Sequence, residues 1–150
     1  MKRTTAGIIA VSAAFPSLAL TRADAQTAQD IVGTWTPVSA VSQRGDAKID
    51  NFGSDPSGTM VFGGDGRFVL VFARSDLPKF ASNRRASGTP DENRAVVQGS
   101  IAPFGADLVG EAGKALVLRI EGGTFPNWAA AEQRRAMAIS GDELTYTPTP

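Results

Sequence analysis

The stretch "QDIVGTWTPVSA", Gln29 to Ala40, places one of the chain's two tryptophans directly after a Gly-Thr pair. Its aliphatic, threonine and aromatic residues predict a first β-strand from Ile31 to Val41. Gly33 lets the backbone pack closely beside the ring of Trp35. Pro37 cannot donate a hydrogen bond to a neighbouring strand, so it marks a bend or an edge position. The stretch therefore predicts a bent first strand that buries an indole.

Beyond this strand, short apolar runs alternate with Gly, Asp, Asn and Pro, which is typical of an antiparallel all-β meander. The clearest hairpin joins "GTMVF" to "RFVLVFAR" through "GGDG", a tight turn that needs positive φ. Further strands are predicted around Lys48 to Phe52 and at "APFGADLV", "ALVLRIE", "QRRAMAIS" and "ELTYT". We expect the meander to close into a barrel of about eight strands, because closure removes exposed edges. Such an interior can hold one small ligand.

One helix interrupts the meander. Thr89 is a good N-cap, Pro90 takes the first helical position and Glu92 completes a capping box. The strand from Arg67 to Ala73 is apolar on both faces, so one face should lie in the barrel and the other needs a cover. We expect this helix, about ten residues long, to be the cover.

The first 25 residues have the pattern of a secretory signal peptide. Lys2 and Arg3 form a basic head, Ala6 to Leu20 is an uncharged, mostly apolar run, and Ala23 and Ala25 fit a signal peptidase site. The alternative is a membrane anchor, but the run is short for a span, which needs roughly 20 apolar residues. We therefore predict cleavage after Ala25, a barrel domain over 26–150, no membrane span after cleavage, and a periplasmic or secreted protein.

Charge and cysteine content narrow the classes of partner. The predicted leader holds three of the 15 basic and one of the 15 acidic residues, so the remaining chain carries 12 basic and 14 acidic residues, a net charge of −2. This balance argues against nucleic acid and anionic membranes as partners. The chain has no cysteine, so no disulfide can form and the core must hold the fold alone.

The residue types also restrict the chemistry. With no histidine and no cysteine, the chain lacks Ser-His-Asp and Cys-His nucleophile systems and an imidazole metal site. Asp91 and Glu92 are explained by helix capping, and Asp142 and Glu143 by a turn. The turn "GEAGK" lacks the spacing of a phosphate-binding loop. We therefore predict no catalytic residue, no metal site and no cofactor.

Four stretches of the chain resemble the bacterial lipocalin-like domain proteins. They are "IVGTWTPVSA", "FGSDPSGTMVFGGDGRF", "LPKFASNRRASGTPDENRAVVQGSIAPFG" and "TFPNWAAAEQRRAMAISGDELTYT". The resemblance covers nearly all of residues 30–147 and implies a calycin-type barrel with a cavity for a small ligand. It implies little about activity. Two positions depart from the family pattern: Pro37 stands where Leu is usual, and Asp107 where an aromatic residue is common.

The resemblance also implies a structural floor made of Gly33, Trp35 and Arg135. In lipocalin-type barrels a first-strand Trp packs under the floor against an Arg from the last part of the barrel. Arg135 alternates in phase with Met137 and Ile139, an apolar face, so we expect it to point inward. A guanidinium over an indole contributes about 0.5–2 kcal/mol.

Ligand-binding groups are expected near the open end of the barrel. Arg74 and Glu121 each end an apolar strand just before a loop, and loops on a rigid barrel gather binding groups. A head group could meet Arg74, with an acyl or aromatic body against a set of apolar side chains. That set is Phe72, Phe104, Leu118 and Tyr146. The alternative is that Arg74 and Glu121 form a surface ion pair.

Three functions follow from these features. The leading hypothesis is an exported protein that binds a small hydrophobic or amphipathic molecule in the barrel. The second is an isomerase or cyclase in which a buried carboxylate, Glu121 or Asp107, acts as general base. The third is a filled barrel that serves as an interaction protein in the envelope. Ligand identity and oligomeric state stay open.

Overall fold

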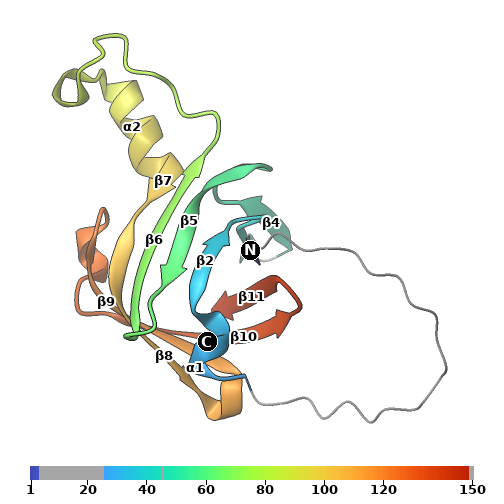
Figure 1. The fold of residues 1–150 in the computed structure, drawn as a ribbon. Coiled ribbons are helices and arrows are strands. Elements are labelled where there is room, and N and C mark those ends of the chain that lie inside the picture. Colours follow the sequence, from blue (N-terminus) through green and yellow to red (C-terminus); the bar gives the residue numbers. More distant parts are fainter. Residues whose placement is uncertain (4–25, 45, 149–150) are drawn as a thin grey trace.

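The computed structural model describes residues 1–3, 26–44 and 46–148 (Figure 1). The apolar run and the cleavage site of the predicted leader lie outside the described residues. None of the helices in the described part of the chain is long and apolar enough to cross a membrane.

An antiparallel sheet of eight strands curls into a nearly closed barrel, which confirms the predicted all-β fold. Around the ring the strands are β5 (Pro56–Phe62), β2 (Gly33–Thr36), β1 (Lys2–Arg3), β11 (Glu143–Pro148), β10 (Glu132–Ser140), β9 (Ala115–Gly123), β8 (Pro103–Gly110) and β6 (Arg67–Arg74). The pairing of β5 with β6 brings the two ends of this order together, and the short β7 (Ser100–Ile101) adds to β6. The connections include the 3-10 turns Arg85–Ser87, Glu111–Gly113 and Pro126–Trp128.

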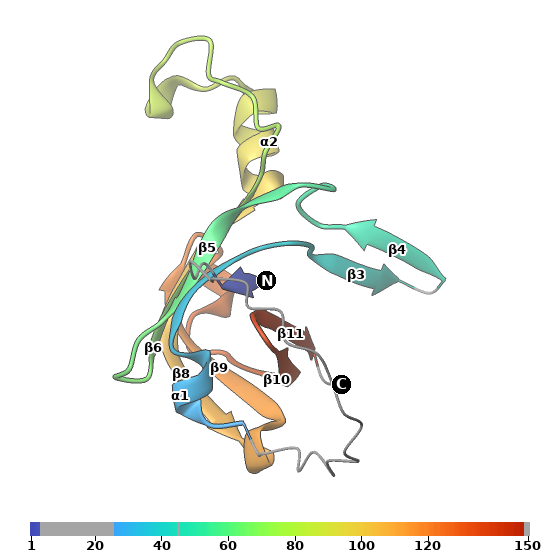
Figure 2. The same ribbon diagram turned by 45° about the vertical axis from the view of Figure 1, so that its right-hand side comes forward.

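The predicted first strand is divided into three parts. Helix α1 (Ala28–Ile31) comes first, β2 follows, and the chain leaves the barrel after Thr36. Strand β3 (Val41–Arg44) then pairs with β4 (Ala47–Asp50) in a separate two-stranded sheet that extends away from the ring (Figure 2). The single strand predicted over Ile31 to Val41 is therefore wrong, because Pro37 lacks the amide hydrogen that would continue the ladder.

The hairpin of β5 and β6 forms as predicted. The two strands pair from Pro56 opposite Arg74 to Phe62 opposite Phe68. In the turn, Gly66 has a φ of 74°, a left-handed conformation that glycine adopts without a steric penalty. The alternation of buried and exposed residues along β6 directs Phe68, Leu70 and Phe72 inward.

Helix α2 (Pro90–Gly99) has the predicted first residue, the predicted length and the predicted capping box. The backbone N–H of Thr89 donates to Glu92 Oε2 at 2.7 Å, and the Glu92 N–H donates to Thr89 Oγ1 at 3.2 Å. The helix stands at one end of the barrel, beside β7 (Figure 1). It leaves the outward Val69 and Val71 of β6 exposed at 49% and 43%, so the expected cover of that face does not form.

Helices α1 and α2 lie at opposite ends of the barrel (Figures 1 and 2), and the packed part of the core includes Trp35 and Ile31 of α1. Trp35 is 1% exposed, and its Nε1–H donates to the Ile31 carbonyl at 2.8 Å. This bond satisfies the indole's one polar group inside the core. Other fully buried side chains here are Met60, Phe62, Phe68, Leu116 and Leu144. Burial of each large apolar side chain stabilises the fold by about 1.5–3 kcal/mol.

Strand β1 has only two residues, and it pairs with both β2 and β11. Lys2 lies opposite both Thr36 of β2 and Glu143 of β11. The Leu144 N–H donates to the Met1 carbonyl at 3.0 Å, and the Met1 amino group donates to the Leu144 carbonyl at 3.3 Å. The side of the barrel between β2 and β11 is therefore closed by the first residues of the chain.

This bridge predicts a specific effect of removing residues 1–25. In a chain that begins at Gln26, the Leu144 amide loses its acceptor, so we expect its hydrogen exchange, measured by NMR, to be faster by more than about tenfold. The Met137 amide of β10 donates at 2.8 Å to the carbonyl of Lys114, the residue before β9, so it is the internal control and should keep its protection. Equal protection of Leu144 in both chains would contradict a structural role for β1.

Candidate ligand pocket

The half of the barrel nearer α2 contains a cavity of about 720 Å³, referred to below as the pocket. Inward side chains of four barrel strands contribute to its wall: Leu70, Phe72, Leu118, Ile120, Gln133, Arg135, Leu144 and Tyr146. Further lining comes from residues 38–42, Phe52, Trp128 and the end of α2 at Val97 and Gln98. The lining is mainly apolar with a few polar groups, the usual composition of a small-molecule site.

The pocket is open here because the sheet is incomplete on this side. After Pro37 the chain no longer follows the ring, and residues 38–42, the last two of which begin β3, form the wall in place of a barrel strand. Phe52, which follows β4, packs edge-on against Phe72 with ring centroids 6.0 Å apart. The hairpin of β3 and β4 thus brings an aromatic side chain back to the pocket.

Arg135 is the cationic side chain in the described lining of the pocket, which also includes Met1 with its amino terminus. One Nη2–H donates to Gln133 Oε1 at 2.6 Å, and its Cζ lies 5.0 Å from the centroid of the Tyr146 ring. Its Nε is buried and has no hydrogen-bond partner. Burial raises the pKa of Tyr146 above its ordinary value of 10.0, an effect that the charge of Arg135 partly offsets. Tyr146 is therefore neutral at physiological pH.

The ring that lies beside the Arg135 guanidinium is that of Tyr146, whereas the predicted partner was Trp35. Arg135 lies opposite Pro148, five residues along β10 from Ser140, which lies opposite Glu143 beside the hairpin turn. On the other side of β10, Arg135 lies opposite Leu116 of β9, which is fully buried in the packed part of the core. Strand phase correctly gave the inward face of Arg135, and the residue lines the pocket.

The other predicted ligand-binding residues divide between the two faces of the barrel. Phe72, Leu118 and Tyr146 line the pocket. Phe104 is 44% exposed on the outer face of β8. It stands beside a register irregularity at Phe104/Gly105, and the inward positions there are Pro103 and Gly105.

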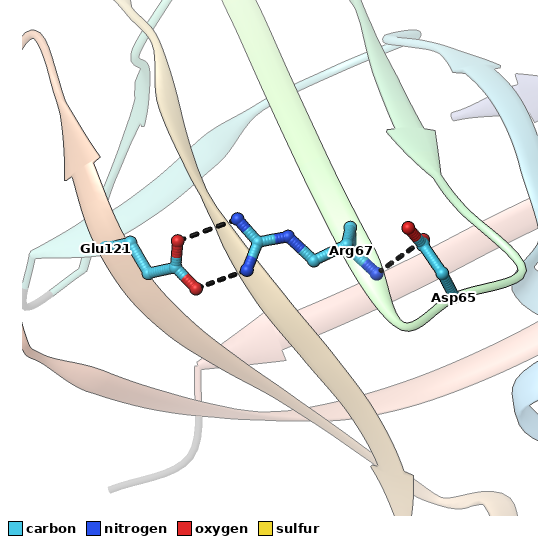
Figure 3. Close-up of polar contacts among 3 residues, drawn as sticks. All are labelled: Asp65, Arg67 and Glu121. Carbon is cyan, nitrogen blue, oxygen red and sulfur yellow. Dashed lines mark hydrogen bonds and ion pairs between the residues drawn. The ribbon is translucent and has the colours of Figure 1, made fainter.

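Arg74 and Glu121 are exposed and lie in separate ion pairs. Arg67 donates through Nη2 to Glu121 Oε2 at 2.7 Å, and its Nη1 contacts Glu121 Oε1 (Figure 3). The hydrogen bond from Arg67 lowers the pKa of Glu121 below its usual range. Arg74 pairs instead with Asp76 at 2.7 Å. Neither Arg74 nor Glu121 lines the pocket, and the alternative, an ion pair between these two residues, does not form either.

Asp107 is a half-buried carboxylate away from the pocket lining. Its Oδ1 is buried without a hydrogen-bond partner, and burial raises its pKa, with a further contribution from the nearby charge of Asp65. Within the described lining, the carboxylate is that of Glu143, which is exposed. No group of three or more metal-ligating side chains occurs among the residues that the structure describes.

The model of one family, the lipocalin-like domain, matches residues 32–150 of the chain. The chain belongs to the lipocalin-like domain family. The match begins directly before β2 and includes α2 and every barrel strand except β1. A search of curated proteins and a search of solved structures found no match.

Several lining residues of this lipocalin-like barrel were not identified from the sequence. Gln133 could have been found, because it is in phase with Arg135 and Met137 on β10. Residues 38–42 and Phe52 could not, because their place in the wall depends on how the hairpin of β3 and β4 folds back. No periodicity within those segments encodes that placement.

The environment of Asp107 predicts that its ionised form destabilises this lipocalin-like fold. A pKa raised above the ordinary 3.8 means that stability is lost as pH rises from that value through the folded-state pKa. We therefore expect Asp107→Asn to raise the thermal midpoint at pH 7 by roughly a few degrees, with the gain disappearing below about pH 3.8. Asp142→Asn, in an exposed turn, is the control and should change little. A lower midpoint for Asp107→Asn at pH 7 would contradict this account.

Proposed function

We propose that this lipocalin-like protein binds a small hydrophobic or amphipathic ligand in the pocket. The pocket itself carries the proposal: its volume of about 720 Å³ lies within the range of roughly 300–1,000 Å³ usual for ligand sites. Its wall combines apolar side chains, such as Phe72 and Leu118, with polar ones that include Gln133 and Arg135. This composition suits a ligand with a large apolar body and one polar group.

The same observations weigh against the two alternatives. A filled barrel would leave a cavity well below roughly 300 Å³. An isomerase of the kind considered needs a desolvated carboxylate facing the substrate. Glu121 is exposed and paired with Arg67, and Asp107 lies off the pocket lining. Ligand binding is therefore the function that the described residues support best.

We also propose that the protein is exported to the periplasm or secreted, on the strength of the leader pattern in residues 1–25. Removal of this segment would take β1 out of the ring and Met1 out of the pocket lining. The exported chain would then have a more open side between β2 and β11. Mass spectrometry of the protein from the producing cell should find Gln26 at its amino terminus, and an intact Met1 would contradict export by cleavage.

Filling the pocket tests ligand binding directly. Leu118 is 3% exposed and lines the pocket, so Leu118→Trp should occupy part of the cavity. We expect it to weaken binding of the neutral dye Nile red, measured by directly excited fluorescence, by at least about tenfold, or 1.4 kcal/mol. Arg119→Trp places the same ring on the next residue, which is exposed, and should leave the affinity unchanged.

Thermal unfolding should show that both variants are folded. The proposal fails if the unmodified protein does not bind the dye. It also fails if both variants bind the dye with equal affinity.

A further inference from the structure

Arg135 places a positive charge in a wall that is otherwise mainly apolar. The charged side chains of the described pocket lining are Arg135 and Glu143. They are on different levels of the barrel, because Glu143 lies opposite Ser140 whereas Arg135 lies opposite Pro148. No ion pair joins Arg135 to any carboxylate in the described part of the chain.

Other arginines of this barrel do have carboxylate partners. Those with an ion pair are Arg67, Arg74, Arg94, Arg119 and Arg134. All five are largely exposed, and their counter-charges lie on the surface beside them. Arg134 and Arg135 are adjacent on β10 and make the contrast clear: Arg134 faces outward to Glu111, and Arg135 faces the pocket without an anion.

The contacts that Arg135 does make orient its guanidinium but do not neutralise it. Gln133 Oε1 accepts one N–H at 2.6 Å, and the Tyr146 ring lies beside the cation. Tyr146 brings no negative charge, because burial raises its pKa and keeps the phenol protonated. The buried Nε–H remains without an acceptor. A buried polar donor without a partner costs free energy, which an acceptor supplied from the pocket would offset.

We infer that the ligand carries a carboxylate and that Arg135, held by Gln133, binds it while the apolar body of the ligand lies against Phe72 and Leu118. The inference rests on the proposed function of the pocket. A guanidinium presents parallel N–H donors that match the two oxygens of a carboxylate, and such charged hydrogen bonds are stronger than neutral ones. The expected ligand class is therefore an amphipathic carboxylate such as an alkanoate.

Three probes with the same alkyl chain separate head-group recognition from pocket binding. Dodecanoate, dodecanol and dodecylammonium are titrated into the full chain by displacement of Nile red. We expect dodecanoate to bind at least about tenfold more tightly than dodecanol, the effect of a charge-assisted hydrogen bond, and dodecylammonium to bind least tightly. This comparison needs no variant.

Two variants with the same change in charge then assign the effect to one residue. Arg135→Gln should lower the affinity for dodecanoate by at least about tenfold while the affinity for dodecanol changes less than about twofold. Arg134→Gln removes a neighbouring charge from the outer face and should leave the preference for dodecanoate intact. Arg135→Lys keeps the charge without the planar donors and should give an intermediate preference.

The outcomes distinguish the inference from the proposed function. Equal binding of dodecanoate and dodecanol by the unmodified protein would overturn carboxylate recognition and leave pocket binding intact. Equal losses for both probes in Arg135→Gln would also overturn it. Failure of the unmodified protein to bind Nile red and all three probes would overturn the proposed function itself.

Discussion

Pro37 has no amide hydrogen, and this one constraint determines where the barrel wall stops being a sheet. Strand β2 ends at Thr36, and the chain leaves the ring to form the hairpin of β3 and β4. On the side of α1, Trp35 and its neighbours fill the interior between paired strands. On the side of α2, residues 38–42 and Phe52 form part of the wall, and the interior stays open. One barrel thus has a packed half that supplies stability and an open half that can hold a ligand.

Charge is distributed differently on the two faces of this barrel. On the outside, arginines such as Arg67 and Arg119 meet carboxylates in exposed pairs that water and salt screen, so these pairs contribute little to specificity. Inside, Arg135 meets an amide and a phenol ring but no anion. A charge in an apolar cavity acts through a lower effective dielectric than a surface charge, so its interaction with a ligand would be stronger. Arg135 therefore differs from the surface arginines in its position inside the barrel and not in its residue type.

Local signals in the sequence predicted most of the fold. The capping box of Thr89 and Glu92 set the start of α2, and the glycine-rich turn set the hairpin of β5 and β6. Two-residue periodicity placed Leu118 and Arg135 on the inner face, because that face is encoded within a single strand. These features depend on neighbours in the chain, so one sequence suffices to find them.

Contacts that depend on how distant strands pair could not be predicted from local patterns. Periodicity gives the face of Arg135 but not the ring beside it, which is that of Tyr146, two residues from the Pro148 that lies opposite Arg135 on β11. The partner of Glu121 proved to be Arg67, which lies 54 residues away in the chain, because β6 and β9 both flank β8. The role of β1 in closing the ring is likewise a long-range contact that no local pattern encodes.

The central claim is that the half of the barrel nearer α2 is an unfilled cavity with a cationic group in its wall. A crystal structure grown with 12-bromododecanoate tests this claim most directly, because anomalous scattering locates the bromine independently of the rest of the ligand. The account predicts a bromine peak among the apolar side chains of the pocket, with the carboxylate within hydrogen-bonding distance of Arg135. A pocket filled by the protein's own side chains, or a bromine peak found only on the outer surface, would contradict it.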